Sequence, residues 1–133
     1  MGADKMKRDM DLVRELLLKI ADAKEPPTFS ALVPDRQNKS PEYAHAAYQM
    51  HMLIEEVGLV SGIDVCSQSG DDWLDLKLTW AGNDFLDTIR DATVWAKTKD
   101  GLKKLGGASW DVLVDMAKAY AKAEAKKRLG LDL

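Results

Sequence analysis

The sequence predicts a mainly helical α+β fold, and two patterns lead to that prediction. Apolar side chains recur at helical spacing in residues 6–22 and 41–57, which is typical of amphipathic helices. Residues 73–79 alternate apolar and polar side chains, as a half-buried strand does. At 133 residues the chain has the length of one ordinary domain and can bury a core without disulfides.

The N-terminal half predicts two helices joined by a loop. The first helix spans residues 6–22 and ends before Pro26-Pro27, because proline cannot continue a helix. Residues 25–40 form the loop, with a short extended piece at 28–33. Ser40-Pro41-Glu42 is a favourable start for a helix that runs to Val57, with an N-cap, a proline at the first position and an acid in the first turn.

The C-terminal half predicts a β-hairpin and three more helices. Strands at 63–66 and 73–79 flank a Ser/Gly/Asp-rich turn. Thr79 caps a helix through Arg90, a second helix ends at Leu105, and Ser109 caps a last helix through Leu129. This order is the layout of a winged helix-turn-helix with a two-stranded wing. We therefore expect a winged-helix domain at 6–91 and a C-terminal helical extension at 92–133.

Three stretches of the sequence resemble motifs of a known family. They are residues 6–14 (Met-Lys-Arg-Asp-Met-Asp-Leu-Val-Arg), 53–60 (Leu-Ile-Glu-Glu-Val-Gly-Leu-Val) and 78–91 with Val94-Trp95. Together they resemble a domain-of-unknown-function family of phage and prophage proteins, over most of residues 6–115. Asn83 stands where we expect a histidine in that family. YjcQ-like bacterial proteins are more distantly similar. The resemblance implies a winged-helix fold, phage origin and no known catalytic activity.

Composition restricts the class of protein. The net charge is −3, which is not the strongly basic balance of a typical nucleic-acid binder, and residues 61–92 hold seven acidic and two basic side chains. No apolar run is long enough to span a membrane, and no signal peptide follows Met1. A single cysteine, Cys66, fits a reducing compartment. We expect a cytoplasmic protein of a bacterial host that has no membrane partner.

No pattern in the chain predicts an enzyme, a metal site or a cofactor. His45 and His51 are six residues apart on one helix, roughly 240° around its axis, so they cannot share a metal ion. Cys66 is expected to be a packed thiol and not a nucleophile, and Asp71, Asp72 and Asp75 to be solvated turn residues. The four tryptophans are expected in the core: Trp73, Trp80, Trp95 and Trp110.

The outer face of helix 41–57 is the expected contact surface, because a winged helix inserts this helix into the major groove. Its candidate contact residues, together with two loop cations, are Arg36, Lys39, His45, Tyr48, Gln49 and Met52. The face holds neither Arg nor Lys and ends in Glu55-Glu56, which disfavours phosphate contacts. Two functions therefore stay open: a DNA-binding regulator with weak affinity for duplex DNA, and a winged-helix protein that contacts a host or phage protein.

The last helix predicts self-association. Trp110, Leu113, Ala117 and Tyr120 lie along one face of it, while most of its lysines point elsewhere. Because Gly106-Gly107 sets this helix apart from the preceding chain, its apolar stripe is expected to pair with a second copy in a two-fold homodimer. The alternative is that the helix folds back onto its own core.

Overall fold

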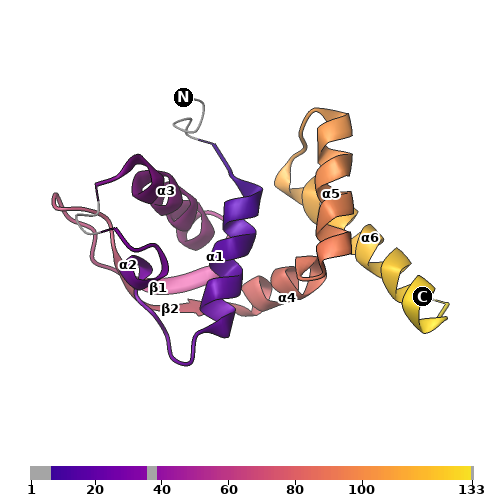
Figure 1. The fold of residues 1–133 in the computed structure, drawn as a ribbon, viewed down its shortest axis with the longest axis horizontal. Coiled ribbons are helices and arrows are strands. Elements are labelled where there is room, and N and C mark those ends of the chain that lie inside the picture. The colour runs from indigo at the N-terminus through magenta and orange to yellow at the C-terminus, as the bar shows by residue number, and fades with distance from the viewer. Residues whose placement is uncertain (1–6, 36–38, 133) are drawn as a thin grey trace. The chain divides into compact units, whose positions relative to one another are not determined.

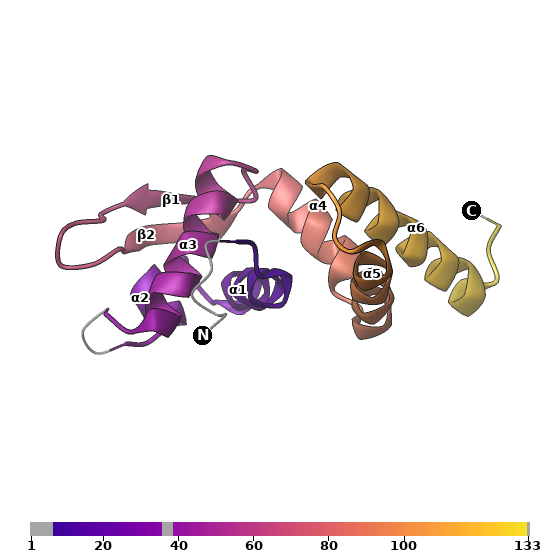
Figure 2. The ribbon, with the colours of Figure 1, turned by 90° about the horizontal axis from the view of Figure 1, so that it is seen from above.

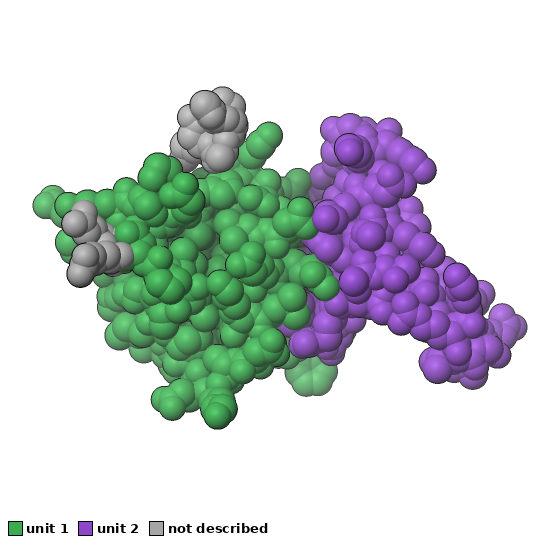
Figure 3. Space-filling model, in the orientation of Figure 1, with its two compact units in different colours: residues 1–83 green, residues 84–133 purple. Residues whose placement is uncertain are grey.

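The computed structural model describes residues 7–35 and 39–132 of the chain. It is mainly helical with one two-stranded antiparallel sheet, so the predicted α+β class is confirmed. The chain divides into two compact units, residues 1–83 and 84–133 (Figure 3). This division falls inside helix α4 (Trp80–Ile89), whereas the sequence placed a boundary after residue 91.

Unit 1 begins with two helices that differ from the prediction. Helix α1 spans Met10–Asp22 and starts four residues later than expected, because Asp9 is its N-cap and its carboxylate accepts the Leu12 N–H. The predicted extended piece at 28–33 is wrong. Thr28 caps a single helical turn there, α2 (Phe29–Leu32), since its side chain accepts the Ala31 N–H.

Helix α3 and the hairpin complete unit 1. Helix α3 spans Pro41–Glu55 with Ser40 as N-cap, as predicted. Strands β1 (Val60–Asp64) and β2 (Trp73–Leu78) pair antiparallel, with an irregular register between Ser61 and Ile63. Opposite this irregularity Asp75 has φ 56°, a left-handed conformation typical of a bulge.

The bulge changes which face of β2 is buried. Strict alternation predicts that Leu74 and Leu76 share one face, but Leu76 is buried and Leu74 is 40 % exposed. Trp73 is fully buried instead, three residues before Leu76. The hairpin thus presents Trp73 and Leu76 to the helices, and Figures 1 and 2 show α1, α2 and α3 gathered against it.

The core of unit 1 comes from all of these elements. Its largest side chains meet at Phe29, whose ring contacts Tyr43 and Trp73 edge-to-face, with both pairs of ring centroids 5.1 Å apart. Other buried apolar side chains in the described part of unit 1 include Val13, Leu16, Leu17, Ile20, Leu32, Ala46, Ala47, Met50, Leu53, Leu59, Val60 and Leu76. Leu59 and Val60, where the hairpin begins, are therefore buried as deeply as the core residues of the helices.

Unit 2 is helical. After α4 it contains α5 (Ala92–Leu105), capped by Asp91, and α6 (Trp110–Leu129), capped by Ser109. Gly106 ends α5 in the left-handed conformation, as the sequence predicts. Helices α5 and α6 pack together, and Gly101 lets them approach closely: a Cβ there would lie 2.4 Å from the Met116 Cε.

Candidate functional site

The predicted contact residues are not all on the surface. Lys39 is exposed, whereas His45, Tyr48 and Met52 are half-buried. Gln49 is fully buried, so its placement on the outer face of α3 is wrong. Arg36 lies outside the described residues.

Gln49 has a structural role that explains its burial. Its Oε1 accepts the Asp9 N–H at 2.8 Å, and its Nε2 donates to the Lys7 carbonyl at 3.0 Å. Next to it, His45 Nε2 lies 2.9 Å from the Asp9 carboxylate. These bonds join the start of α1 to the middle of α3. The side chain that the sequence offered for reading bases instead holds two helices together.

The surface that α3 leaves exposed is acidic. Glu42 lies in its first turn, and Glu55 and Glu56 close its last turn, all three exposed. No Lys or Arg occurs in residues 41–57. Since phosphate contacts supply most of the non-specific affinity for DNA, this helix is electrostatically ill suited to enter a groove.

A polar cluster forms where the C-terminal part of α3 meets the hairpin turn. His51 Nδ1 lies 2.8 Å from the Glu55 carboxylate, and its Nε2 lies 3.1 Å from Asp71 Oδ2. Cys66 joins them: one ligand atom each from His51, Cys66 and Asp71 lies within 4.8 Å of the others. All three side chains are half-buried.

The hairpin register brings Cys66 and Asp71 together. Ser67 and Gly70 form a bridge at the turn, so Cys66 and Asp71 are the next pair of facing residues on the side of the strands. Asp71 also lies two residues before Trp73, the first residue of β2, so an extended chain directs both side chains to the same side. That face lies against α3, where the His51 ring contacts Trp73 edge-to-face with centroids 4.7 Å apart.

The protonation equilibria of this cluster are perturbed. Burial alone would lower the pKa of His51, but its hydrogen bonds to Glu55 and Asp71 raise that pKa overall. Burial, with the neighbouring carboxylate of Asp64, raises the pKa of the Cys66 thiol to about 12. The protonated thiol is therefore stable at neutral pH, which is unlike the thiolate that nucleophilic catalysis needs.

Tyr43 anchors the same turn from the core side. Its hydroxyl donates to the Asp71 carbonyl at 2.6 Å. Burial, followed by the charges of Asp72 and Asp71, raises the pKa of Tyr43 to about 12. The backbone at Asp71 is thus fixed by a buried neutral phenol, which holds the adjacent carboxylate in place opposite His51.

No sequence pattern predicts that His51, Cys66 and Asp71 lie together, and each was expected to have no role in a site. The sequence does hold a signal for the proximity of Cys66 and Asp71: the two residues flank a four-residue Ser-Gln-Ser-Gly turn and face each other across it. The proximity of His51 depends on how α3 packs on the hairpin. No spacing within the sequence encodes that contact.

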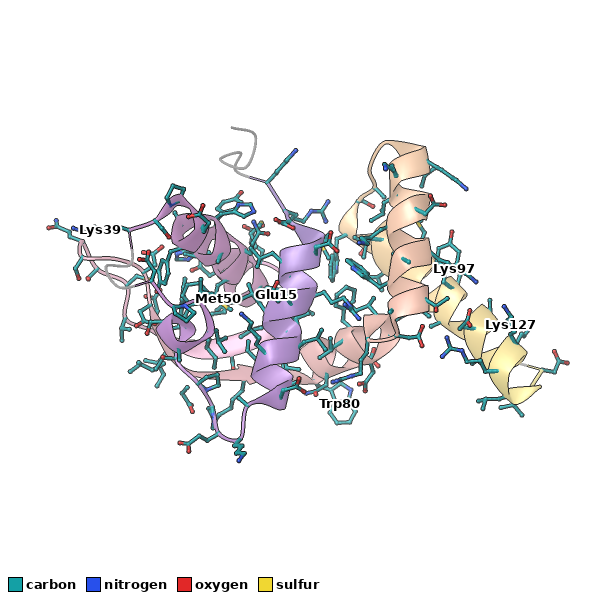
Figure 4. The ribbon with its side chains drawn as sticks, viewed as in Figure 1. Glu15, Lys39, Met50, Trp80, Lys97 and Lys127 are labelled. Atoms are coloured by element: carbon teal, nitrogen blue, oxygen red, sulfur yellow. The ribbon has the colours of Figure 1, made fainter. Side chains whose placement is uncertain are left out.

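Trp80 contradicts the expectation that the tryptophans are core residues. Trp73 and Trp95 are buried and Trp110 is half-buried, but Trp80 is 90 % exposed. Among the large apolar side chains that the structure describes as exposed, it is the most exposed. Figure 4 shows its ring extending away from the ribbon.

The cause of this exposure lies at Gly82. The Gly82 Cα faces the backbone of Leu59 so closely that a Cβ there would lie 1.9 Å from the Leu59 oxygen. The Gly82 N–H also binds Thr79 Oγ1, whose hydroxyl donates to the Gly58 carbonyl at 2.6 Å. These contacts fix the rotation of the first turn of α4. Trp80 precedes Gly82 by two residues, roughly 200° around the helix, and so points to solvent.

A cavity of about 510 Å³ lies elsewhere in unit 1, between α1, the segment after α2 and the start of α3. Its walls are mostly apolar, with charged or polar groups from Glu15, Lys19, Glu42 and His45. The apolar lining residues are Leu12, Leu16, Leu32, Val33, Pro34, Pro41 and Ala46. Such a cavity has the size of a small-ligand pocket and can equally receive an apolar side chain.

The expected dimer face of α6 is partly covered. Leu113 and Ala117 are buried, and α6 packs on α5. The Trp110 ring contacts Phe85 with centroids 4.8 Å apart, and Tyr120 lies against Gly101. The helix thus folds back within unit 2, which was the alternative. Whether the chain dimerises stays a prediction.

Comparison with known proteins shows which family the chain belongs to. Residues 7–109 match the family described as "Hypothetical protein (DUF2513)", so the chain belongs to that family, and the predicted membership of a domain-of-unknown-function family is confirmed. The chain is 32 % identical over 117 residues to an uncharacterized protein of Haemophilus influenzae (strain ATCC 51907 / DSM 11121 / KW20 / Rd). That match covers 87 % of this chain and 92 % of the relative. No solved structure matches.

No helix in the described part of the chain is both long and apolar enough to cross a membrane.

Proposed function

We propose that this chain is a winged-helix protein of phage or prophage origin that acts by binding a protein partner. The element order supports the winged-helix assignment: α1, α2 and α3 are followed directly by the antiparallel pair β1–β2. The sequence resemblance supports the phage origin. The proposed function involves no catalytic step and is exercised in the cytoplasm of a bacterial host.

The observation that carries this proposal is the 90 % exposure of Trp80. A tryptophan held out in water by a rigid helix start loses the free energy that burial of its large apolar ring would bring. Tryptophan is one of the residue types enriched among the energetically dominant residues of protein interfaces, because it fills an apolar pocket and its indole N–H finds an acceptor there. The partner expected for Trp80 therefore has an apolar pocket with a hydrogen-bond acceptor in its wall.

The exposed apolar side of the hairpin offers a second contact surface. Ile63 and Leu74 are paired across β1 and β2, and they are 55 % and 40 % exposed. Val65 follows at 41 % exposure. Contiguous aliphatic side chains outside the core are typical of a surface that is covered in a complex.

A photo-crosslinking experiment tests the proposal. Benzoylphenylalanine replaces Trp80 in one variant and Leu105, which is 63 % exposed in unit 2, in a control variant. We expect a defined, nuclease-resistant protein adduct in host lysate from position 80 and none from position 105. The Trp80→Ala variant, added unlabelled, should fail to compete while wild type competes. Equal adducts from both positions, or none from position 80, would contradict the proposal.

The second candidate function, a DNA-binding regulator, is favoured by the winged-helix order alone. The acidic face of α3 predicts that any duplex binding is weak and insensitive to sequence, with a Kd of roughly 10⁻⁴–10⁻⁶ M. Fluorescence anisotropy with mixed-sequence and selected duplexes at physiological salt measures this. Tight binding that discriminates between sequences would favour the regulator over the protein-contact function.

A further inference from the structure

We propose that His51 Nε2, Cys66 Sγ and the Asp71 carboxylate form a binding site for one zinc-like divalent metal ion. The three ligand atoms come from two directions, α3 and the hairpin turn, and lie within 4.8 Å of one another. No spacing motif predicts this site, and it goes beyond the proposed protein-contact function.

The donor set fits zinc in type. Zinc accepts an imidazole nitrogen at about 2.0 Å, a carboxylate oxygen at about 2.0–2.2 Å and a thiolate sulfur at about 2.3 Å. Tetrahedral ligands at these lengths lie roughly 3.3–3.6 Å from each other. The His51 Nε2 and Asp71 oxygen are already 3.1 Å apart. A small rotation of the Cys66 side chain toward them would close the set. Calcium and magnesium prefer oxygen ligands and fit less well.

Glu55 supplies the outer contact that metal-binding histidines usually have. Its carboxylate lies 2.8 Å from His51 Nδ1, one turn along α3. When the Nδ1–H keeps its proton and donates a hydrogen bond to this carboxylate, Nε2 is unprotonated and its lone pair is directed at Cys66 and Asp71. A carboxylate that orients the ring in this way also raises the basicity of the ligating nitrogen.

The surrounding charge favours a cation. Asp64 accepts the Cys66 N–H at 2.8 Å, and Asp72 lies beside Asp71 with its carbonyl 3.6 Å from Cys66 Sγ. The negative charges of the Asp64 and Asp72 carboxylates attract a metal cation, as the ligands themselves do. On binding, the Cys66 thiol releases one proton to solvent and the thiolate bonds to the ion, so the local negative charge is partly neutralised.

The alternative is a hydrogen-bond cluster that needs no metal. A doubly protonated His51 between Glu55 and Asp71 already satisfies both ring nitrogens. In that arrangement the Cys66 thiol donates to the Asp72 carbonyl and is not needed by the His51 ring, whereas the metal site needs its sulfur as a ligand. Substitution at Cys66 therefore separates the two explanations.

The site would tie the tip of the hairpin to α3. His51 belongs to the helix, and Cys66 and Asp71 sit on either side of the turn between β1 and β2. Three protein ligands leave a fourth position of a tetrahedral ion for water or for a group from a partner. Metal binding would raise the stability of unit 1 by an amount that grows with the logarithm of the free metal concentration divided by Kd.

The test is titration of the full, tag-free chain with zinc by calorimetry and with cobalt by absorption spectroscopy. We expect one equivalent of metal at micromolar affinity or tighter, and a thiolate-to-cobalt charge-transfer band. Cys66→Ser should abolish the band and weaken zinc binding at least roughly tenfold. Glu55→Gln should weaken it by about 10–100-fold.

Two matched variants serve as controls. His45→Gln alters the other histidine, and Glu56→Gln alters the neighbouring carboxylate, so neither should change affinity. Circular dichroism checks that each variant is folded, and Asp71→Asn replaces Cys66→Ser if the latter does not fold. Absence of zinc binding to wild type, or binding that Cys66→Ser leaves unchanged or His45→Gln weakens equally, would overturn the metal site. None of these outcomes bears on Trp80, so the protein-contact function is tested independently.

Discussion

Replacing Gly82 by alanine should destabilise unit 1, although alanine is the better helix former. The added Cβ would lie 1.9 Å from the Leu59 oxygen and 2.9 Å from its carbonyl carbon. Both atoms are backbone, so the start of α4 or the segment after α3 must move. That carbonyl accepts the Thr79 N–H at 3.0 Å, and Thr79 Oγ1 donates to the Gly58 carbonyl, so the movement strains two hydrogen bonds as well.

The magnitude follows from opposing effects. Overpacking against a rigid group costs about 1–3 kcal/mol, and each weakened hydrogen bond about 0.5–1.5 kcal/mol. Alanine recovers about 1 kcal/mol through helix propensity. With two strained hydrogen bonds, we expect a net loss of about 1–5 kcal/mol in the free energy of unfolding. Urea denaturation of the full chain, followed by circular dichroism and tryptophan fluorescence, measures it.

Gly101 provides the matched control. It also lies in a helix, but a Cβ there meets the Met116 Cε at 2.4 Å and the Tyr120 hydroxyl at 3.0 Å. These are ends of side chains that can rotate away. Gly101→Ala should therefore change the free energy of unfolding by less than about 1 kcal/mol. If Gly82→Ala is no more destabilising than Gly101→Ala, the close approach of α4 to Leu59 is wrong.

Three further predictions follow from buried and paired groups. Gln49→Leu should cost about 1–3 kcal/mol in urea denaturation, because it leaves two backbone groups ahead of α1 without their partners; an unchanged midpoint would contradict this. Arg128 holds the pKa of Asp91 below its usual range, and Lys97 does the same for Glu124. The ion pairs of Asp91 and Glu124 should therefore stabilise the fold above about pH 5, and this stabilisation should be lost as the pH falls through the lowered pKa values of the two carboxyls. Thermal melts at a series of pH values measure this loss, and Arg128→Met should make it smaller. A chain truncated after Leu105 should lose the helical signal of unit 2, since α6 buries its apolar face on α5. Light scattering on the full chain tests the predicted homodimer, and a monomer across micromolar concentrations would contradict it.

The packing on α6 bears on the predicted homodimer. Leu113 and Ala117, which the sequence offered to a second copy, are buried in the chain itself. A dimer built on α6 would have to use its remaining exposed apolar groups, such as Val112 at 42 % and Leu129 at 66 % exposure. The periodicity of α6 correctly identified an apolar stripe but not the surface that covers it.

The sequence by itself determined the helices and most of their ends. Ser40 and Ser109 cap the helices that they were expected to cap, and Gly106 ends α5, because capping depends on a side chain and the few backbone groups next to it. The family was equally readable from local motifs, since residues 7–109 match it. Thr28 was misjudged because a single turn carries no helical period to detect.

Only the tertiary structure decided the features on which function depends. Gln49 is buried because the chain ahead of α1 packs on it, and Trp80 is exposed because the close approach of Gly82 to Leu59 fixes the rotation of the first turn of α4. His51 reaches Cys66 and Asp71 because α3 lies across a hairpin whose turn places those two side by side. Each of these contacts joins residues that are distant in sequence. Periodicity and capping report only interactions within a few residues of one another, so they carry no information about such contacts.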